Sequence, residues 1–268
     1  MGKRFYTGFT LIETMLFLAI TGMLIAGVLI GTGTSINNQR YRDAVESLKS
    51  LIQTQYSEIG SVKNDRSNNL SCGTSGTSAT PTTGSQYRGQ SSCVIVGRYM
   101  VINGTDSNGA SKISIYTVLA KQKSTTERSS DIETMKNNYT YSVTPEVETD
   151  TMEWSTQIAW PKSGTGAKSP TTPRSIGILF VRSPETGTIY TFSTDTVAST
   201  ASSAFTNMMV AGASVPGRGE RTICVKSDGV SGGDRAIYIA PSAASASAIE
   251  TQTNDLMKSA SGSGASQC

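Results

Sequence analysis

The sequence predicts an α+β fold in which one long N-terminal helix packs on a mostly antiparallel β-sheet. An apolar stretch near the N-terminus continues into residues with helical periodicity, whereas the rest of the chain is rich in Ser, Thr and Gly. In that later part, short β-branched and aromatic runs separated by turn residues indicate strands joined by hairpins. The 268 residues leave room for one membrane segment and one or two compact domains.

The N-terminal segment has the length and composition of a membrane-spanning helix. Residues 14–39 contain no charge, and the 22 residues 9–30 would form a helix about 33 Å long, enough to cross a hydrocarbon core of about 30 Å. Lys3 and Arg4 precede this run, which predicts a single pass through the cytoplasmic (inner) membrane with the leader inside and the bulk outside. A secretory signal peptide and an uncleaved signal anchor are the alternatives, but Glu13 interrupts the apolar run.

Residues 8–13 read GFTLIE and lie between the short basic leader and the apolar run. This string resembles the processing site of the type IV pilin and type II secretion pseudopilin family. The resemblance implies that a prepilin peptidase cuts between Gly8 and Phe9, methylates the new amino terminus, and makes Glu13 the fifth residue of the mature chain. It also implies that the Glu13 carboxylate meets the N-terminal ammonium of the next subunit inside a filament.

This pairing has a physical reason, because a carboxylate in an apolar helix bundle is costly unless a cation neutralises it. The pairing would also set the axial register of each incoming helix. Gly22, Gly27 and Gly31 are candidates for close helix packing, and the last two form a GxxxG spacing. Generic packing in the membrane is the alternative for these glycines.

The helical pattern continues past the membrane segment, so the predicted helix covers residues 9–59. Its apolar positions recur mostly at three- and four-residue steps, at Ile36, Tyr41, Val45, Leu48, Ile52, Tyr56 and Ile59. The predicted organisation is a cleavable leader (1–8), a transmembrane or filament-core helix (9–31), its amphipathic continuation (32–60), a flexible loop (61–92) and an extracytoplasmic β-rich head (93–268).

Strands of the head are predicted from β-branched and aromatic runs, at residues 94–102, 113–119, 139–147, 152–160, 176–182, 188–192, 222–226 and 236–240. Residues 242–259 are predicted to form a helix. Trp154 and Trp160 lie six residues apart on one candidate strand, so we expect them on the same face, in the core or in a subunit contact.

Four cysteines, Cys72, Cys93, Cys224 and Cys268, follow the apolar segment, and their even number suits an oxidising exterior. Unpaired thiols are the alternative. A Cys72–Cys93 bridge would close about 20 residues and contribute roughly 3 kcal/mol. It would leave Cys224 to pair with Cys268, which resembles the C-terminal disulfide-bounded loop common in pilins. Four cysteines allow three connectivities, and the sequence does not select one.

Composition argues against catalysis. The chain has no histidine, which excludes Ser-His-Asp and Cys-His mechanisms and the commonest zinc ligand. We therefore expect no enzyme and no cofactor. We expect a pilin-like subunit that polymerises into a type IV pilus or related filament for adhesion, motility or DNA uptake. The length of the chain favours a minor subunit. Its expected partners are other pilin subunits, the prepilin peptidase, the assembly platform and the membrane. The alternatives are a pseudopilin of type II secretion and a membrane-anchored extracytoplasmic binding protein.

Two groups of charged residues are candidate binding sites. Possible calcium ligands are Asp106, Asn108, Asp228 and Asp234, but they lack the spacing of a dedicated loop, so turn chemistry explains them and no metal site is predicted. A possible DNA-binding patch consists of Arg218, Arg221, Lys226 and Arg235. Acidic residues interleave with it, and without the leader 21 basic residues face 20 acidic ones, a net charge of +1. A mixed-charge surface is therefore favoured over nucleic-acid binding.

Overall fold

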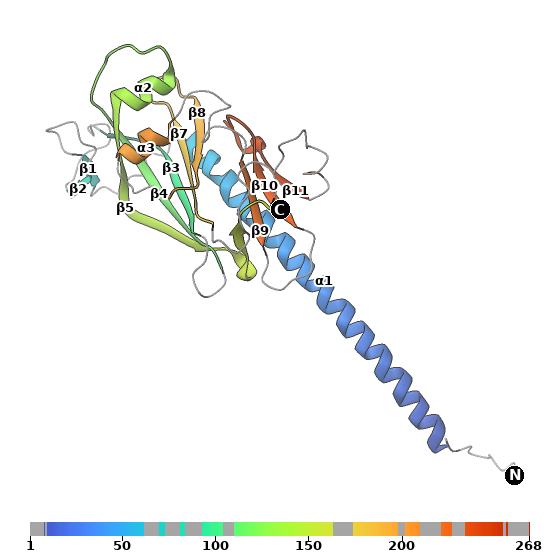
Figure 1. The fold of residues 1–268 in the computed structure, drawn as a ribbon. Coiled ribbons are helices and arrows are strands. Elements are labelled where there is room, and N and C mark those ends of the chain that lie inside the picture. The colour runs from blue at the N-terminus through green and yellow to red at the C-terminus, as the bar shows by residue number, and fades with distance from the viewer. Residues whose placement is uncertain are drawn as a thin grey trace, which may run out of the picture.

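The fold is that of a computed structural model of the chain. It describes residues 8, 10–61, 93–103, 110–162, 174–197, 202–209, 221–226, 234–253, 256 and 268, together with the backbone of 70–72 and 81–83. The predicted α+β class is confirmed: one long helix projects from a head built on antiparallel sheets (Figure 1).

Helix α1 (Leu11–Gly60) is continuous over 50 residues, or about 75 Å. It begins two residues later than predicted, because Thr10 has an extended backbone (φ −77°, ψ 153°) and caps the helix with its side chain. At the other end, the Ser61 N–H donates to the Ser57 carbonyl at 3.0 Å. The residues of α1 that are buried all lie in its second half, from Tyr41 to Ile59.

Two antiparallel sheets make up most of the head. The larger has the order β5-β4-β3-β7-β8, with β3 (Cys93–Asn103), β4 (Lys112–Gln122), β5 (Tyr139–Thr151), β7 (Ile176–Arg182) and β8 (Ile189–Thr194). The smaller has the order β11-β10-β9-β6, with β6 (Gln157–Ala159), β9 (Arg221–Lys226), β10 (Arg235–Ile239) and β11 (Ile249–Thr253). Seven predicted strands coincide with observed strands to within a few residues. The eighth, 152–160, is described below.

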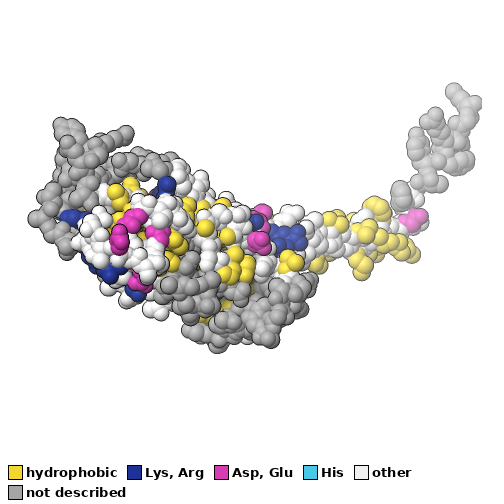
Figure 2. Space-filling model, turned by 90° about the horizontal axis from the view of Figure 1, so that it is seen from above, with side chains coloured by type: hydrophobic (Ala, Val, Ile, Leu, Met, Phe, Trp, Pro, Cys, Tyr) yellow, Lys and Arg dark blue, Asp and Glu magenta, His cyan; other side chains and the backbone are white. Residues whose placement is uncertain are grey.

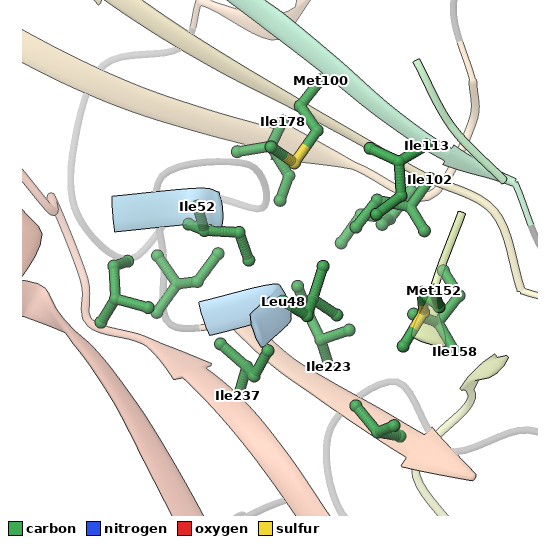
Figure 3. Close-up of a cluster of buried hydrophobic side chains, with 14 of the residues drawn as sticks. Leu48, Ile52, Met100, Ile102, Ile113, Met152, Ile158, Ile178, Ile223 and Ile237 are labelled. Carbon is green, nitrogen blue, oxygen red and sulfur yellow. The ribbon is translucent and has the colours of Figure 1, made fainter. Parts of the chain in front are cut away.

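The second half of α1 lies between these two sheets. Leu48 and Ile52 form the centre of one continuous apolar core (Figure 3). On one side they face residues of the larger sheet, Met100, Ile102, Ile113 and Ile178; on the other they face Ile223 and Ile237 of the smaller sheet (Figure 3). The prediction that the apolar stripe rests on a sheet is therefore correct but incomplete, because a second sheet covers the opposite side.

The other face of the larger sheet is covered by two short helices that the sequence prediction missed. They are α2 (Asp131–Asn138) and α3 (Ser202–Met208). Alternate residues of β3 belong to two different apolar cores, one on each face of the larger sheet. Tyr99 and Val101 pack in the core of Phe205 of α3, whereas Met100 and Ile102 face α1. The head is thus layered as helices, larger sheet, α1 and smaller sheet.

A buried arginine connects the two sheets. Arg174, which precedes β7 and is only 2% exposed, donates to Asp195 at 3.0 and 3.1 Å and to the Thr222 carbonyl of β9 at 2.7 Å. Its guanidinium also lies over the buried ring of Trp160, 4.9 Å from the centroid. Arg221 of β9 donates to the same Asp195 at 2.7 Å. These bonds fix the end of the larger sheet to the smaller sheet.

Three predictions about the chain after residue 60 are wrong in whole or in part. Residues 242–259 do not form one helix: a 3₁₀ turn η2 (Ala246–Ala248) leads into β11, which pairs with β10. Leu256 is helical, and 254–255 and 257–259 lie outside the described residues. The predicted strand 152–160 is interrupted by the 3₁₀ turn η1 (Glu153–Ser155). The predicted loop 61–92 contains a short pair of strands, β1 (Leu70–Cys72) and β2 (Pro81–Thr83), and its other residues after Ser61 lie outside the described part.

The two tryptophans consequently lie in different environments. Trp154, in η1, is 54% exposed, whereas Trp160, beyond β6, is 6% exposed. The expectation that they share one face is wrong, because η1 interrupts the strand and with it the alternation of side chains between the two faces. Trp160 is a core residue, and Trp154 is a surface residue.

Candidate functional site

The first half of α1 is apolar and uncovered. Every large hydrophobic side chain between Leu11 and Ile30 is 52% to 80% exposed. Figure 2 shows these side chains along the part of the helix that projects from the head, with an acidic group near its far end. Within the described residues, α1 is the one helix long and apolar enough to cross a membrane. Because soluble chains rarely expose so continuous an apolar surface, this half-helix is consistent with a membrane anchor.

Glu13 lies at the start of this half and is held by its own helix cap. The Thr10 N–H and the Thr10 hydroxyl both donate to Oε2 of Glu13, at 3.0 and 2.9 Å. In return, the Glu13 N–H donates to the Thr10 hydroxyl at 3.3 Å, which completes a capping box. Among the described residues, no hydrogen bond reaches Oε1. One oxygen of the carboxylate therefore serves the cap, and the other can accept from a donor outside the chain.

Thr10 is a site residue that the sequence prediction did not identify. The signal was present, because Thr followed three residues later by Glu, just before an apolar run, is the signature of a capping box. The GFTLIE string was interpreted only through Gly8, Phe9 and Glu13. The structure adds that Thr10 fixes the position of the carboxylate relative to the helix axis.

The threonine side chains of the exposed half are satisfied within the helix. The hydroxyls of Thr14, Thr21, Thr32 and Thr34 each donate to a carbonyl one turn earlier, at 2.8 to 3.0 Å for the shorter bond of each. Such bonds let threonine lie in an apolar environment without an unpaired donor. Glu13 is therefore the polar group in this half that most needs an external partner.

The predicted processing and packing glycines lie in open space. For Gly8, Gly22, Gly27 and Gly31, nothing lies within 4 Å of the place where a Cβ would be. The fold of a single chain therefore does not require glycine at these positions, and an external partner that approaches closely is a sufficient reason for it. Phe9 and the leader cations Lys3 and Arg4 lie outside the described residues.

The structure contains one of the predicted disulfide pairings. Cys224 of β9 and Cys268 at the chain end form a disulfide with a Cα–Cα distance of 5.5 Å, and both pack against Ala236 on the outer side of the smaller sheet. Cys93 is also disulfide-bonded and is buried. The side chain of Cys72 lies outside the described residues, so the Cys72–Cys93 bridge stays a prediction.

The charged groups weighed as binding sites do not assemble in the described residues. No group of three or more metal-ligating side chains is present there, and Asp234 instead pairs with Lys162 at 2.9 Å. Asp106, Asn108, Asp228 and Arg218 lie outside the described residues. Within the candidate DNA-binding patch, Arg221 forms an ion pair with Asp195, whereas Lys226 is exposed at the end of β9. The patch is therefore not a set of open cations.

Comparison of the chain with protein-family models, with curated proteins and with solved structures finds no match. The candidate site is consequently defined by its own geometry. It consists of an uncovered apolar half-helix, a carboxylate with one free oxygen at its start, and a second half that is enclosed by the head.

Proposed function

We propose that this chain is a structural subunit of a type IV pilus or a related filament, that a prepilin peptidase processes it, and that it polymerises through α1. The observation that carries this proposal is the division of α1 into two halves of opposite character. The first half is apolar and uncovered, and the second is built into the head. A helix of this kind can pass from a membrane into a bundle of identical helices without any change in the head.

The start of the helix supplies the chemistry for a specific register. Once the chain is cut after Gly8, the new amino terminus would lie four residues before Glu13, at the same level of the bundle as the carboxylates of neighbouring subunits. Oε1 of Glu13 is free to accept from such an ammonium, while Oε2 stays bonded to Thr10. In an apolar bundle, the carboxylate of one subunit and the ammonium of the next meet at only one axial offset between the two helices, so the ion pair selects that offset.

The head provides the outer surface of the proposed filament. Eight residues of α1 are buried in it, from Tyr41 to Ile59, so the helix and the head move as one body. The loops and sheet edges of the head would be available for contacts between subunits or for adhesion. A role in assembly explains the exposed helix and the GFTLIE string together, whereas a simple anchored binding protein needs neither the glycine nor the carboxylate.

Cleavage is the direct test. The full chain is co-expressed with a prepilin peptidase, and the mass of its amino-terminal peptide is measured. We expect loss of residues 1–8 and one added methyl group on Phe9. A Gly8→Val variant is the matched control and should stay uncut, because its side chain blocks close approach of the peptidase. An intact Met1 in the unaltered chain would refute the proposal.

A further inference from the structure

The turn η1 holds a large apolar side chain at the surface in a strained conformation. Trp154 and Ser155 both have φ of +54°, in the left-handed region that bulky residues rarely adopt. Trp154 is nevertheless 54% exposed, and outside α1 it is the one aromatic residue among the exposed large hydrophobic residues of the described chain. Strain of this kind persists where the surroundings enforce it, and it often marks a functional surface.

The surroundings of η1 do enforce it. On one side the buried Met152 donates its N–H to the Ser111 carbonyl at 2.9 Å, and on the other the Ser111 N–H donates to the carbonyl of the buried Thr156 at 3.1 Å. Thr156 also donates both its N–H and its hydroxyl to the Glu153 carbonyl. The turn is therefore fixed at both ends, and it presents Trp154 outward.

Trp154 lies against the part of α1 that leaves the head. The guanidinium of Arg40 lies over the ring, 4.6 Å from its centroid. Arg40 is the first charged residue after Glu13, and it follows Gly31, the last residue of the predicted transmembrane helix, by nine residues, or about 13 Å along the helix. Helical side chains lean toward the N-terminus, which here is the side of the membrane segment. Arg40 and Trp154 therefore belong at the level where a bilayer has its headgroups.

Two more cations lie at the same level. Arg42 is exposed two residues further along the helix, about 3 Å along its axis and on a different face. Among the described residues neither it nor Arg40 has an ion pair. Lys226 is exposed at the end of β9, beside Val225, whose carbonyl accepts a hydrogen bond from the Tyr41 hydroxyl at 2.7 Å. These three cations and Trp154 are called the membrane-side collar below.

Three acidic residues near the collar lie on its head side, whereas Asp234, which pairs with Lys162 at 2.9 Å, lies close to Tyr41 at the level of the collar. Asp43 and Glu46 follow the arginines along α1, and Glu153 accepts from the hydroxyl of Ser47, further from the membrane segment. Figure 2 shows the same order, with Lys and Arg side chains where the helix leaves the head and acidic ones next to them on the head side. Because the three collar cations lie nearer the membrane than Asp43, Glu46 and Glu153, and Lys162 neutralises Asp234, an anionic surface below would attract this end of the head.

We infer that the membrane-side collar binds the headgroups of anionic phospholipids while the chain stands in the membrane outside a filament, and that it thereby holds the head in one orientation. This inference rests on the proposed insertion of α1 into a bilayer. The bilayer is the occupant that the collar meets first, since the same helix enters the membrane directly below it. Trp and Arg both combine an apolar body with a polar group that suits this interface.

Fluorescence quenching tests the inference. The full chain is placed in nanodiscs, one copy in each, that contain anionic lipid labelled with a quencher near the headgroup. The emission of Trp154 is the difference between the unaltered chain and Trp154→Phe, since the buried Trp160 is common to both. We expect headgroup labels to quench Trp154 more strongly than labels at the chain ends. We also expect Arg40→Gln to lower the ratio of docked to undocked heads about fivefold, the factor for one cation at an anionic surface.

Lys49→Gln is the matched control, because Lys49 lies on the same helix about 13 Å further from the membrane, and it should leave the quenching unchanged. Quenching of Trp154 by soluble iodide but not by labelled lipid, in chains that co-elute with the discs, overturns the inference alone. So does quenching that is equal in discs of zwitterionic lipid, or a Trp154 that is covered only when two copies share a disc. Failure of the chain to enter the discs overturns the proposed membrane helix as well, and co-elution reports it separately.

Discussion

Ile52→Ala tests the division of α1 into two halves. Ile52 is fully buried between the two sheets, at the centre of the core (Figure 3). The substitution removes three methylene equivalents, which corresponds to about 2.4 kcal/mol of transfer free energy. The cavity adds about 1 kcal/mol, because sheets on both sides limit how far the site can collapse. The expected loss in the free energy of unfolding of the head is therefore about 3.5 kcal/mol.

The assay is thermal unfolding of the full chain in detergent, followed by near-ultraviolet circular dichroism of the head. A loss of 3.5 kcal/mol corresponds to a decrease in Tm of roughly 10 °C for a domain of this size. Ile25→Ala is the matched control, since it makes the same change on the same helix at a side chain that is 61% exposed. It should change the stability of the head by less than about 0.5 kcal/mol. Equal losses for the two variants, or a loss below about 1 kcal/mol for Ile52→Ala, would refute the two-sided enclosure of α1.

Three further predictions concern assembly, backbone packing and pH. Glu13→Ala should leave the chain inserted in the membrane but absent from sheared filaments, whereas Thr10→Val, which keeps the carboxylate but removes its hydroxyl donor, should lower the yield of filaments less. Gly97→Ala should cost about 3 kcal/mol in denaturant unfolding, because its Cβ would lie 2.0 Å from the Phe180 carbonyl oxygen. Burial raises the pKa of Tyr56 to about 12, so the stability that this contributes is present below pH 10 and is lost as the pH rises from about 10 to about 12.

Each of these has its own control. Normal incorporation of Glu13→Ala into filaments would contradict the pairing of that carboxylate with an ammonium. Gly27→Ala is the control for Gly97→Ala. Nothing lies within 4 Å of the Cβ position of residue 27, so Gly27→Ala should leave the stability of the head unchanged. Tyr56→Phe removes the titrating hydroxyl and its hydrogen bond to Thr191, so its stability should be lower at pH 8 but should depend less on pH above 10. An unchanged pH dependence would show that Tyr56 does not cause the loss.

The sequence predicted correctly those elements that are determined by residues close together along the chain. Helix α1 follows from an apolar run and a three- and four-residue periodicity, both visible in the sequence. The β7–β8 hairpin follows from its turn residues, and Gly187 indeed has a positive φ of 74°. The candidate site at residues 8–13 was found in the same way, because it consists of neighbours along the chain.

Non-local features were missed for a physical reason. β11 has only five residues and follows an Ala- and Ser-rich stretch, so the sequence around it shows no clear strand pattern, and pairing with β10 decides its conformation. Helices α2 and α3 have eight and seven residues, too few to show a clear periodicity. The contact of Arg40 with Trp154 joins residues more than a hundred positions apart, and no local signal predicts it.

The enclosure of α1 on two sides determines how the head resists a pulling force. A helix that packs on a single sheet can be peeled away turn by turn, so that few contacts break at any moment. Between two sheets, the helix can leave only by sliding along its own axis or by separating the sheets, and sliding breaks the contacts of Leu48, Ile52 and Ile59 together. Tension along the projecting half is therefore distributed as shear over the whole enclosed length and reaches both sheets at once.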